Sequence, residues 1–170
     1  MAKIWDIETG TAIDLKINGA DDSTHLEMIE AVAFAPNGLL AFTGSRDHTV
    51  KIWEAKTGIW IRTIQVKAQV AALVISPDSK SLLTSSWDHS IHQWYIETGE
   101  LIGRYPAHTS FIQALVYAKD GKRFYSAATD AKVRLWLSPR GIYEYLQTAP
   151  IYQLNEAERK QYGLDVKFDE

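Results

Sequence analysis

One pattern constrains this chain more than any other feature: an apolar run, a polar turn and a second run ending in tryptophan, repeated three times. The copies occupy residues 39–53, 81–94 and 123–136. Each copy has one aspartate in the turn and one tryptophan six residues later: Asp47 with Trp53, Asp88 with Trp94, and Asp130 with Trp136. The aspartates are 41 and 42 residues apart, and so are the tryptophans. Two landmarks in fixed register at a constant period are typical of a repeat protein.

A small hydroxyl residue lies four positions before each turn aspartate: Thr43, Thr84 and Ser126. An aspartate carboxylate can accept backbone N–H groups and so fix a tight turn between two β-rich runs. Each copy therefore predicts a hairpin, inside a repeat unit of about four short strands. The predicted fold class is all-β.

The chain is expected to divide into a half-repeat, three full repeats and a tail. Residues 1–17 resemble the second half of a repeat, because Lys-Ile-Trp at 3–5 and Thr-Gly at 9–10 recur at 51–53 and 57–58. The expected units are 1–17 (third and fourth strands only), 25–65, 66–107, 108–149, and a C-terminal tail at 150–170 with a short helix at 155–162. The helix is expected because this stretch has helix formers, a capping asparagine and a terminal glycine.

Composition narrows the functional classes. Eighteen basic and 21 acidic residues give a net charge of −3, which argues against a nucleic-acid surface built on bulk charge. There is no cysteine, so disulfides and thiolate chemistry are excluded. No apolar stretch approaches the roughly 18 residues of a membrane span. These observations predict a cytoplasmic protein without a membrane or nucleic-acid partner.

The repeats resemble the WD-repeat β-propeller family in several independent features. The period, the hydroxyl–Asp–Trp spacing, the Ser-Pro-Asp turn at 76–78 and the Trp-Asp pair at 5–6 all fit. The resemblance covers about residues 1–147 and implies four-stranded antiparallel blades arranged around an axis. The predicted architecture is a partial propeller: a half-blade, blade one, blade two and blade three, with a short C-terminal helix.

The resemblance also implies a buried hydrogen-bonded set in each blade. The set joins a histidine before strand one to the strand-two hydroxyl, the turn aspartate and the strand-three tryptophan. The implied sets are His25, Thr43, Asp47 and Trp53 in blade one, and His108, Ser126, Asp130 and Trp136 in blade three. In blade two, Val66 stands where the histidine is expected, so only Thr84, Asp88 and Trp94 remain.

Two alternative interpretations, a catalytic triad and a metal site, fit these residues less well. His25, Thr43 and Asp47 have the residue types of a hydrolase triad, but their spacing recurs along the chain, whereas a catalytic set normally occurs once. His48, His89 and His92 are candidate metal ligands, but the first two follow a turn aspartate, and zinc needs three or four convergent ligands. The sequence therefore predicts no catalytic residues, no metal and no cofactor.

The residues before the turn aspartates are the predicted partner-binding positions: Arg46, Trp87 and Thr129. In WD-repeat proteins this loop lies on a face that often binds partners. Four residues of the preceding loops are expected to border them: Glu27, Met28, Lys67 and Gln69. Trp and Arg are enriched in binding hot spots, so Trp87 is the predicted anchor. The alternative is that Trp87 packs against a neighbouring blade.

The number of blades suggests an incomplete ring. Closed propellers usually hold 4–8 blades, and three and a half leave open faces and edges. We therefore expect either a homo-oligomer or a complementary propeller half. The predicted function is a non-enzymatic protein-interaction scaffold for a protein or peptide partner. The alternative is a sensor or regulatory C-terminal portion of a larger multi-domain enzyme or signalling protein, because the ending also resembles the tails of bacterial proteins of that kind.

Overall fold

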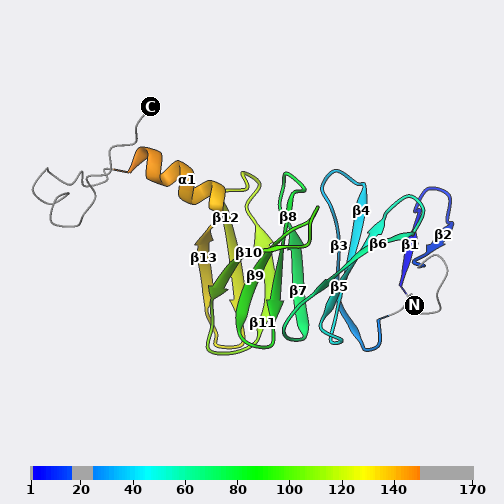
Figure 1. Ribbon diagram of the computed structural model, residues 1–170, viewed down its shortest axis with the longest axis horizontal. Helices are drawn as coiled ribbons and strands as arrows, with labels where there is room; N and C mark the ends of the chain where they lie inside the picture. Colours follow the sequence, from blue (N-terminus) through cyan, green and yellow to red (C-terminus); the bar gives the residue numbers. More distant parts are fainter. Residues whose placement is uncertain (1, 17–24, 150–170) are drawn as a thin grey trace, which may run out of the picture.

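The computed structural model describes residues 2–16 and 25–149 and shows a row of antiparallel sheets (Figure 1). The half-blade is a two-stranded sheet of β1 (Lys3–Trp5) and β2 (Ala12–Asp14). Blade one contains β3 (Ile29–Phe34), β4 (Leu40–Ser45), β5 (Thr49–Glu54) and β6 (Trp60–Gln65). Blade two contains β7 (Val70–Ile75), β8 (Ser81–Ser86), β9 (Ser90–Tyr95) and β10 (Leu101–Pro106).

Blade three has three strands and ends in a helix. It contains β11 (Ile112–Tyr117), β12 (Arg123–Ala128) and β13 (Val133–Leu137), followed by α1 (Pro139–Thr148). In every sheet the strands are neighbours in chain order. The predicted all-β partial propeller of antiparallel blades with a short C-terminal helix is confirmed, and blades one and two have the expected four strands.

The helix lies where a fourth strand of blade three was expected, so that expectation was wrong. Pro139 occupies the first turn of α1, where its missing N–H costs nothing. The Ser138 side chain accepts a hydrogen bond from the Gly141 backbone N–H and donates one to the Gly121 carbonyl. Capping by Ser138 thus starts a helix directly after the third strand of blade three. At the same point blades one and two continue into their fourth strands, β6 and β10. The helix expected at 155–162 lies outside the described residues.

Strand one of each blade carries the same irregularity. Its register against strand two shifts between Ile29 and Ala31 in blade one, and at the matching places in blades two and three. A bulge increases the local twist and re-aims the following side chains. Its recurrence places equivalent side chains of the three blades in equivalent positions.

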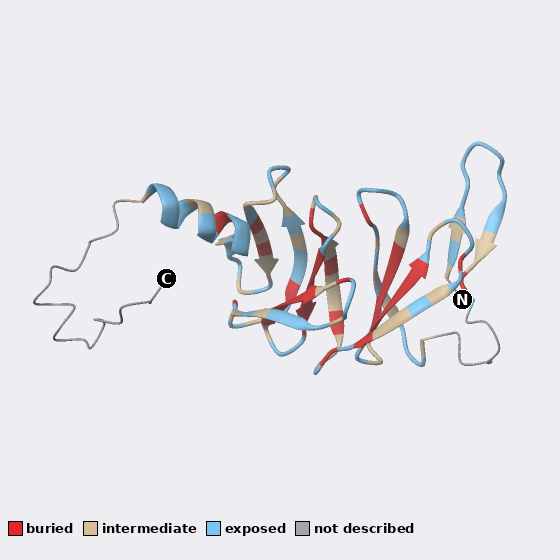
Figure 2. Cartoon of the chain, turned by 45° about the horizontal axis from the view of Figure 1, so that its top comes forward, coloured by how far each residue is buried: buried red, intermediate tan, exposed pale blue. Residues whose placement is uncertain are grey.

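The core lies between blades rather than inside one sheet. Phe42, Val50 and Ile52 of blade one pack with Leu82 and other apolar residues of blade two. A second cluster joins blades two and three, and a third joins the half-blade to blade one. Figure 2 shows buried residues concentrated in the middle strands. A blade therefore reaches full burial only where a neighbour covers each face.

No helix in the described residues is both long and apolar enough to cross a membrane.

Candidate functional site

The hairpin between strands two and three is closed by its aspartate in the same way in each full blade. Asp47 Oδ1 accepts the backbone N–H of Thr49 at 3.0 Å. Asp88 and Asp130 accept the N–H groups two residues further on, at 3.1 and 3.0 Å. The residue after each aspartate has a left-handed backbone: His48 (φ 66°), His89 (φ 65°) and Ala131 (φ 59°). His48 and His89 therefore occupy turn positions, as expected.

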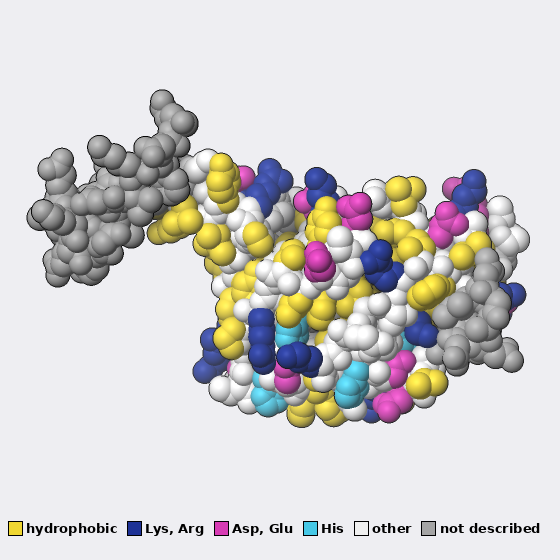
Figure 3. Space-filling model, in the orientation of Figure 1, with side chains coloured by type: hydrophobic (Ala, Val, Ile, Leu, Met, Phe, Trp, Pro, Cys, Tyr) yellow, Lys and Arg dark blue, Asp and Glu magenta, His cyan; other side chains and the backbone are white. Residues whose placement is uncertain are grey.

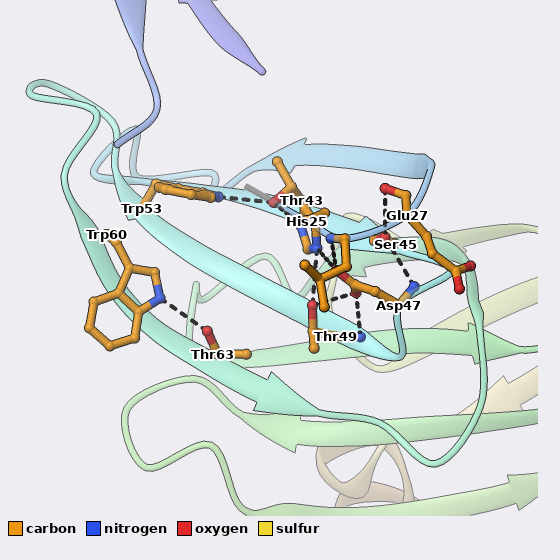
Figure 4. A network of polar contacts seen from close by, with 10 residues as sticks. His25, Glu27, Thr43, Ser45, Asp47, Thr49, Trp53, Trp60 and Thr63 are labelled. Carbon is orange, nitrogen blue, oxygen red and sulfur yellow. Dashed lines mark hydrogen bonds and ion pairs between the residues drawn. The ribbon is translucent and has the colours of Figure 1, made fainter. Parts of the chain in front are cut away.

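In blade one, four side chains form a continuous hydrogen-bonded chain (Figure 4). The Trp53 indole N–H donates to Thr43 Oγ1 at 3.0 Å. Thr43 Oγ1 lies 2.7 Å from His25 Nε2, and His25 Nδ1 lies 2.8 Å from Asp47 Oδ2. Thr49 adds a hydroxyl bond to Asp47 at 2.6 Å. The donors and acceptors are all satisfied when the neutral imidazole carries its proton on Nδ1.

Blade three repeats this arrangement with serine in place of threonine. The Trp136 indole N–H donates to Ser126 Oγ at 2.9 Å. His108 Nε2 lies 2.7 Å from the same oxygen, and His108 Nδ1 lies 2.9 Å from Asp130 Oδ2. The structure thus brings together both four-residue sets that the family resemblance implied.

Blade two keeps the hydroxyl, the aspartate and the tryptophan of the set but not the histidine that would link them. The Trp94 indole N–H donates to Thr84 Oγ1 at 2.9 Å, and Asp88 accepts the Ser90 hydroxyl at 2.6 Å. No histidine joins Thr84 to Asp88. His92, from strand three, is buried nearby, with Nε2 at 3.5 Å from Ser90 Oγ and with Nδ1 unpartnered.

Loss of the histidine opens the blade-two aspartate to solvent. Val66, at the histidine position, is buried in the apolar cluster between blades one and two. The Asp88 side chain is 30% exposed, against 6% for Asp47 and 5% for Asp130. Its nearest cation is the Arg104 guanidinium at 3.6 Å.

The surroundings shift the pKa values of the blade-one pair. Burial lowers the pKa of His25, although the Asp47 carboxylate opposes that shift. Burial alone would raise the pKa of Asp47, but hydrogen bonds from Thr49, His25 and the Leu26 N–H outweigh it, so the pKa lies below its usual value. Asp47 is therefore a carboxylate, and His25 is neutral, at pH 7.

Two of the predicted binding residues, Arg46 and Trp87, contact each other at the end of the blades where strands two and three are joined. The Arg46 guanidinium lies over the Trp87 ring, 5.2 Å from its centroid. The Phe111 ring lies on blade three, 5.0 Å from Trp87, and His89 makes an edge contact to Phe111 at 5.3 Å. Arg46 is also ion-paired to Glu30. We call Arg46, Trp87 and Phe111 the aromatic row, because they cross three neighbouring blades in one line of contacts.

Each residue before a turn aspartate is tied to the residue before strand one of its own blade. The N–H of Arg46 donates to Met28, that of Trp87 to Gln69, and that of Thr129 to Phe111. Phe111 thus occupies the same repeat position as Met28 and Gln69, which the sequence did single out. Sequence reasoning missed Phe111, although the repeat register, carried into blade three, would have found it.

The remaining predicted residues do not join the aromatic row. The Glu27 carbonyl accepts a hydrogen bond from Ser45, and the Glu27 and Lys67 residues are exposed. Thr129 is exposed, and its hydroxyl pairs with that of Ser110 at 2.6 Å. The Trp87 side chain packs against Arg46 and Phe111 on the neighbouring blades and is still 39% exposed.

Both sets have the hydroxyl, imidazole and carboxylate order of a nucleophilic triad, but neither exposes its hydroxyl to a substrate. Thr43 is 2% exposed, and its oxygen is already occupied by Trp53 and His25. Among residues 2–16 and 25–149, no group of three or more His, Cys, Asp or Glu side chains is placed to hold a metal ion.

The fold and the recurrent polar sets define a partial β-propeller assembled from one repeated unit. The WD domain, G-beta repeat family matches residues 21–54, 60–95 and 99–136, and the chain therefore belongs to this family. Membership confirms the predicted class of function, a protein-interaction scaffold built of WD repeats.

Similar proteins include subunits of larger assemblies. The chain is 35% identical over 103 residues to "Target of rapamycin complex subunit LST8-1" of Arabidopsis thaliana, covering 59% of this chain and 33% of that protein. It is 33% identical over 109 residues to "Target of rapamycin complex subunit wat1" of Schizosaccharomyces pombe, covering 62% and 35%. It is 28% identical over 136 residues to "U3 small nucleolar RNA-associated protein 15 homolog" of Gallus gallus, covering 79% and 25%. The chain thus spans about a third or less of these relatives.

Proposed function

We propose that this chain binds a protein or peptide partner on the aromatic row. The observation that carries the proposal is the half-exposed Trp87 ring, held between the Arg46 guanidinium and the Phe111 ring of the next blade. A ring fixed on both sides loses little conformational freedom when a partner covers it, which favours affinity. Trp and Arg are also the residues most enriched in hot spots.

The border of the row suits a polypeptide better than a small metabolite. Met28 is 61% exposed and supplies apolar area, Glu27 and Lys67 are exposed and supply both charges, and Gln69 is half-buried. An apolar centre with a mixed polar rim is the usual anatomy of a protein interface. Thr129 extends the rim onto blade three.

We propose no catalytic role for the chain itself. The two complete sets have the residue types of a triad, but they are buried, repeated and hydrogen-bonded throughout. Their shared function is to hold the turn, so that the preceding residue points its side chain away from a fixed backbone. The binding row therefore depends on the polar sets without including them.

The proposed setting is a cytoplasmic protein complex without a nucleic-acid partner. The net charge of −3 and the absence of cysteine support it. Two of the similar proteins are described as subunits of target of rapamycin complexes, which supports a role inside a protein assembly.

We also propose that the chain forms a homo-oligomer, because its outer blades are incompletely covered. Val32 and Phe34 of blade one are 69% and 56% exposed. The equivalent residues of blade two, Leu73 and Ile75, are covered by blade one and are 8% and 5% exposed. Exposed apolar area of this kind favours association by about 25 cal/mol per Å² buried.

The docking proposal is tested by selecting peptides from a random displayed library on the wild-type chain. The affinity of each selected peptide is then measured on Trp87→Ala, and on Tyr143→Ala as a control that removes an exposed aromatic ring from α1. We expect Trp87→Ala to weaken binding by about 30-fold, equivalent to about 2 kcal/mol, with little change in melting temperature. Selected peptides that bind both variants as tightly as wild type would refute the proposed surface.

A further inference from the structure

The outer strand of blade three, β13, has an open edge. Within the described residues it pairs only with β12, whereas β5 and β9 each have a neighbour on both sides. Val133 is 72% exposed, but the equivalent residues Val50 and Ile91 are fully buried. Leu135 is 55% exposed, against 2% for its equivalent Ile52. Figure 3 shows hydrophobic side chains at the end of the molecule where β13 lies.

Backbone hydrogen bonds show which residues of β13 face this edge. The Lys132 carbonyl accepts the Ala128 N–H, and the Ser138 N–H donates to the Lys122 carbonyl. The even-numbered residues of β13 therefore point their backbone groups at β12, and the odd-numbered ones point outward.

The same outward positions are used in the other two blades. Glu54 and Tyr95 match Leu137, and their N–H groups donate to the carbonyls of Ile59 and Glu100, next to the fourth strand. In blade three, Val133, Leu135 and Leu137 thus present outward N–H and C=O groups together with exposed apolar side chains on one face.

We propose that β13 of a second copy of this chain pairs antiparallel with this edge, about a twofold axis at Leu135. This inference names a specific contact for the homo-oligomer proposed above. In that register Leu135 lies opposite Leu135 of the second copy, and Val133 lies opposite Leu137 of the second copy. Opposed outward-facing residues exchange both of their backbone hydrogen bonds. The result is a continuous sheet with a self-complementary interface, as twofold dimers require.

The sequence of the strand favours this register over its neighbours. An axis at Arg134 would place two guanidinium groups directly opposite each other, which destabilises an antiparallel pair. An axis at Trp136 would bring Pro139, which has no N–H, opposite Val133. The axis at Leu135 instead sets Arg134 against Trp136 of the second copy, a cation and an aromatic ring. Within residues 2–16 and 25–149, the buried Arg134 Nε has no hydrogen-bond partner.

The absence of native cysteine makes this contact easy to test. In Leu135→Cys the two thiols would meet across the axis, since opposed residues of a hydrogen-bonded pair have Cα atoms about 5.5 Å apart, within disulfide range. We expect mild oxidation to give a disulfide-linked dimer. Val32→Cys, on the uncovered face of blade one and more exposed than Leu135, should remain uncrosslinked because the proposed contact lies on β13 at the other end. Crosslinking of Val32→Cys but not of Leu135→Cys would overturn the proposal in favour of contact through the other end.

A second variant separates the contact from folding. Leu135→Lys places like charges opposite each other at the axis while keeping an exposed position. Light scattering should show a dimer for wild type at high micromolar concentration and a monomer for Leu135→Lys, with unchanged circular dichroism. A wild-type monomer under these conditions would refute the inference. The variant should bind peptides selected on the aromatic row as wild type does, so this result is independent of the docking proposal.

Discussion

Blades one and two build the same hairpin with different amounts of polar support. In blade one, His25 connects Thr43 to Asp47, and all three side chains are buried. In blade two the connection is missing, and the aspartate is partly solvated. Both hairpins nevertheless close on the same aspartate bond and keep the same indole-to-hydroxyl bond. The comparison indicates that the hydroxyl, Asp and Trp are the minimum for the unit, and that histidine adds stability.

The largest expected difference is between Thr43→Val and Thr84→Val. Valine keeps the shape of threonine but removes the hydroxyl. In blade one this leaves both the Trp53 indole and His25 without a hydrogen-bond partner. In blade two it leaves only the Trp94 indole without one. An unsatisfied buried group costs about 1–3 kcal/mol, so we expect a loss of about 2–4 kcal/mol for Thr43→Val and about half as much for Thr84→Val. Chemical denaturation measures both, and equal losses would contradict the role given to His25.

A smaller contrast is expected between Asp130→Ala and Asp88→Ala. The first removes the partner of His108 and leaves its ring N–H buried and unpaired, whereas the second removes a carboxylate that water already reaches. Asp130→Ala should therefore lower the denaturant midpoint more than Asp88→Ala. The same midpoint in both variants would show that His108 does not complete a network.

The smallest expected effect is on the pH dependence of stability. Burial lowers the pKa values of His25 and His92, so near the usual histidine pKa of about 6.5 the unfolded chain binds more protons than the folded one. Stability should therefore be full above that pH and fall as the pH drops toward the folded-state pKa values. His25→Gln should reduce the slope between about pH 7 and 5. If stability fell more steeply with falling pH in the variant than in wild type, folding would not lower the pKa of His25.

Much of the fold could be predicted because the constant repeat period shows which residues of the three blades are equivalent, as well as where strands occur. The constant Asp-to-Trp spacing predicted one hairpin in each full repeat, and the structure has them as β4–β5, β8–β9 and β12–β13. The polar sets could be predicted only through the family resemblance, since the contact of His25 with Asp47 joins residues that no local pattern links.

The remaining features depend on contacts that a repeat pattern does not encode. Ser138 and Pro139 start a helix where periodicity predicted a strand, because local capping outweighs the repeat at that point. The repeat register gives Phe111 the same position as Met28 and Gln69, but it does not encode the contact of the Phe111 ring with Trp87 on the adjacent blade. The contacts of Trp87 with Arg46 and Phe111 likewise could not be predicted, because sequence spacing alone does not give the distance between blades.

Nitrogen-15 NMR of the five histidine rings tests the central claim most directly, because it observes the proton that completes the polar sets. We predict that His25 and His108 carry their proton on Nδ1 and that these two protons are protected from exchange, since each faces a buried aspartate. His92 Nδ1 should show no such protected proton. Assignment by His25→Gln and His108→Gln would identify the signals. Rapidly exchanging Nδ1 protons, or an Nε2–H tautomer, at both His25 and His108 would contradict the account.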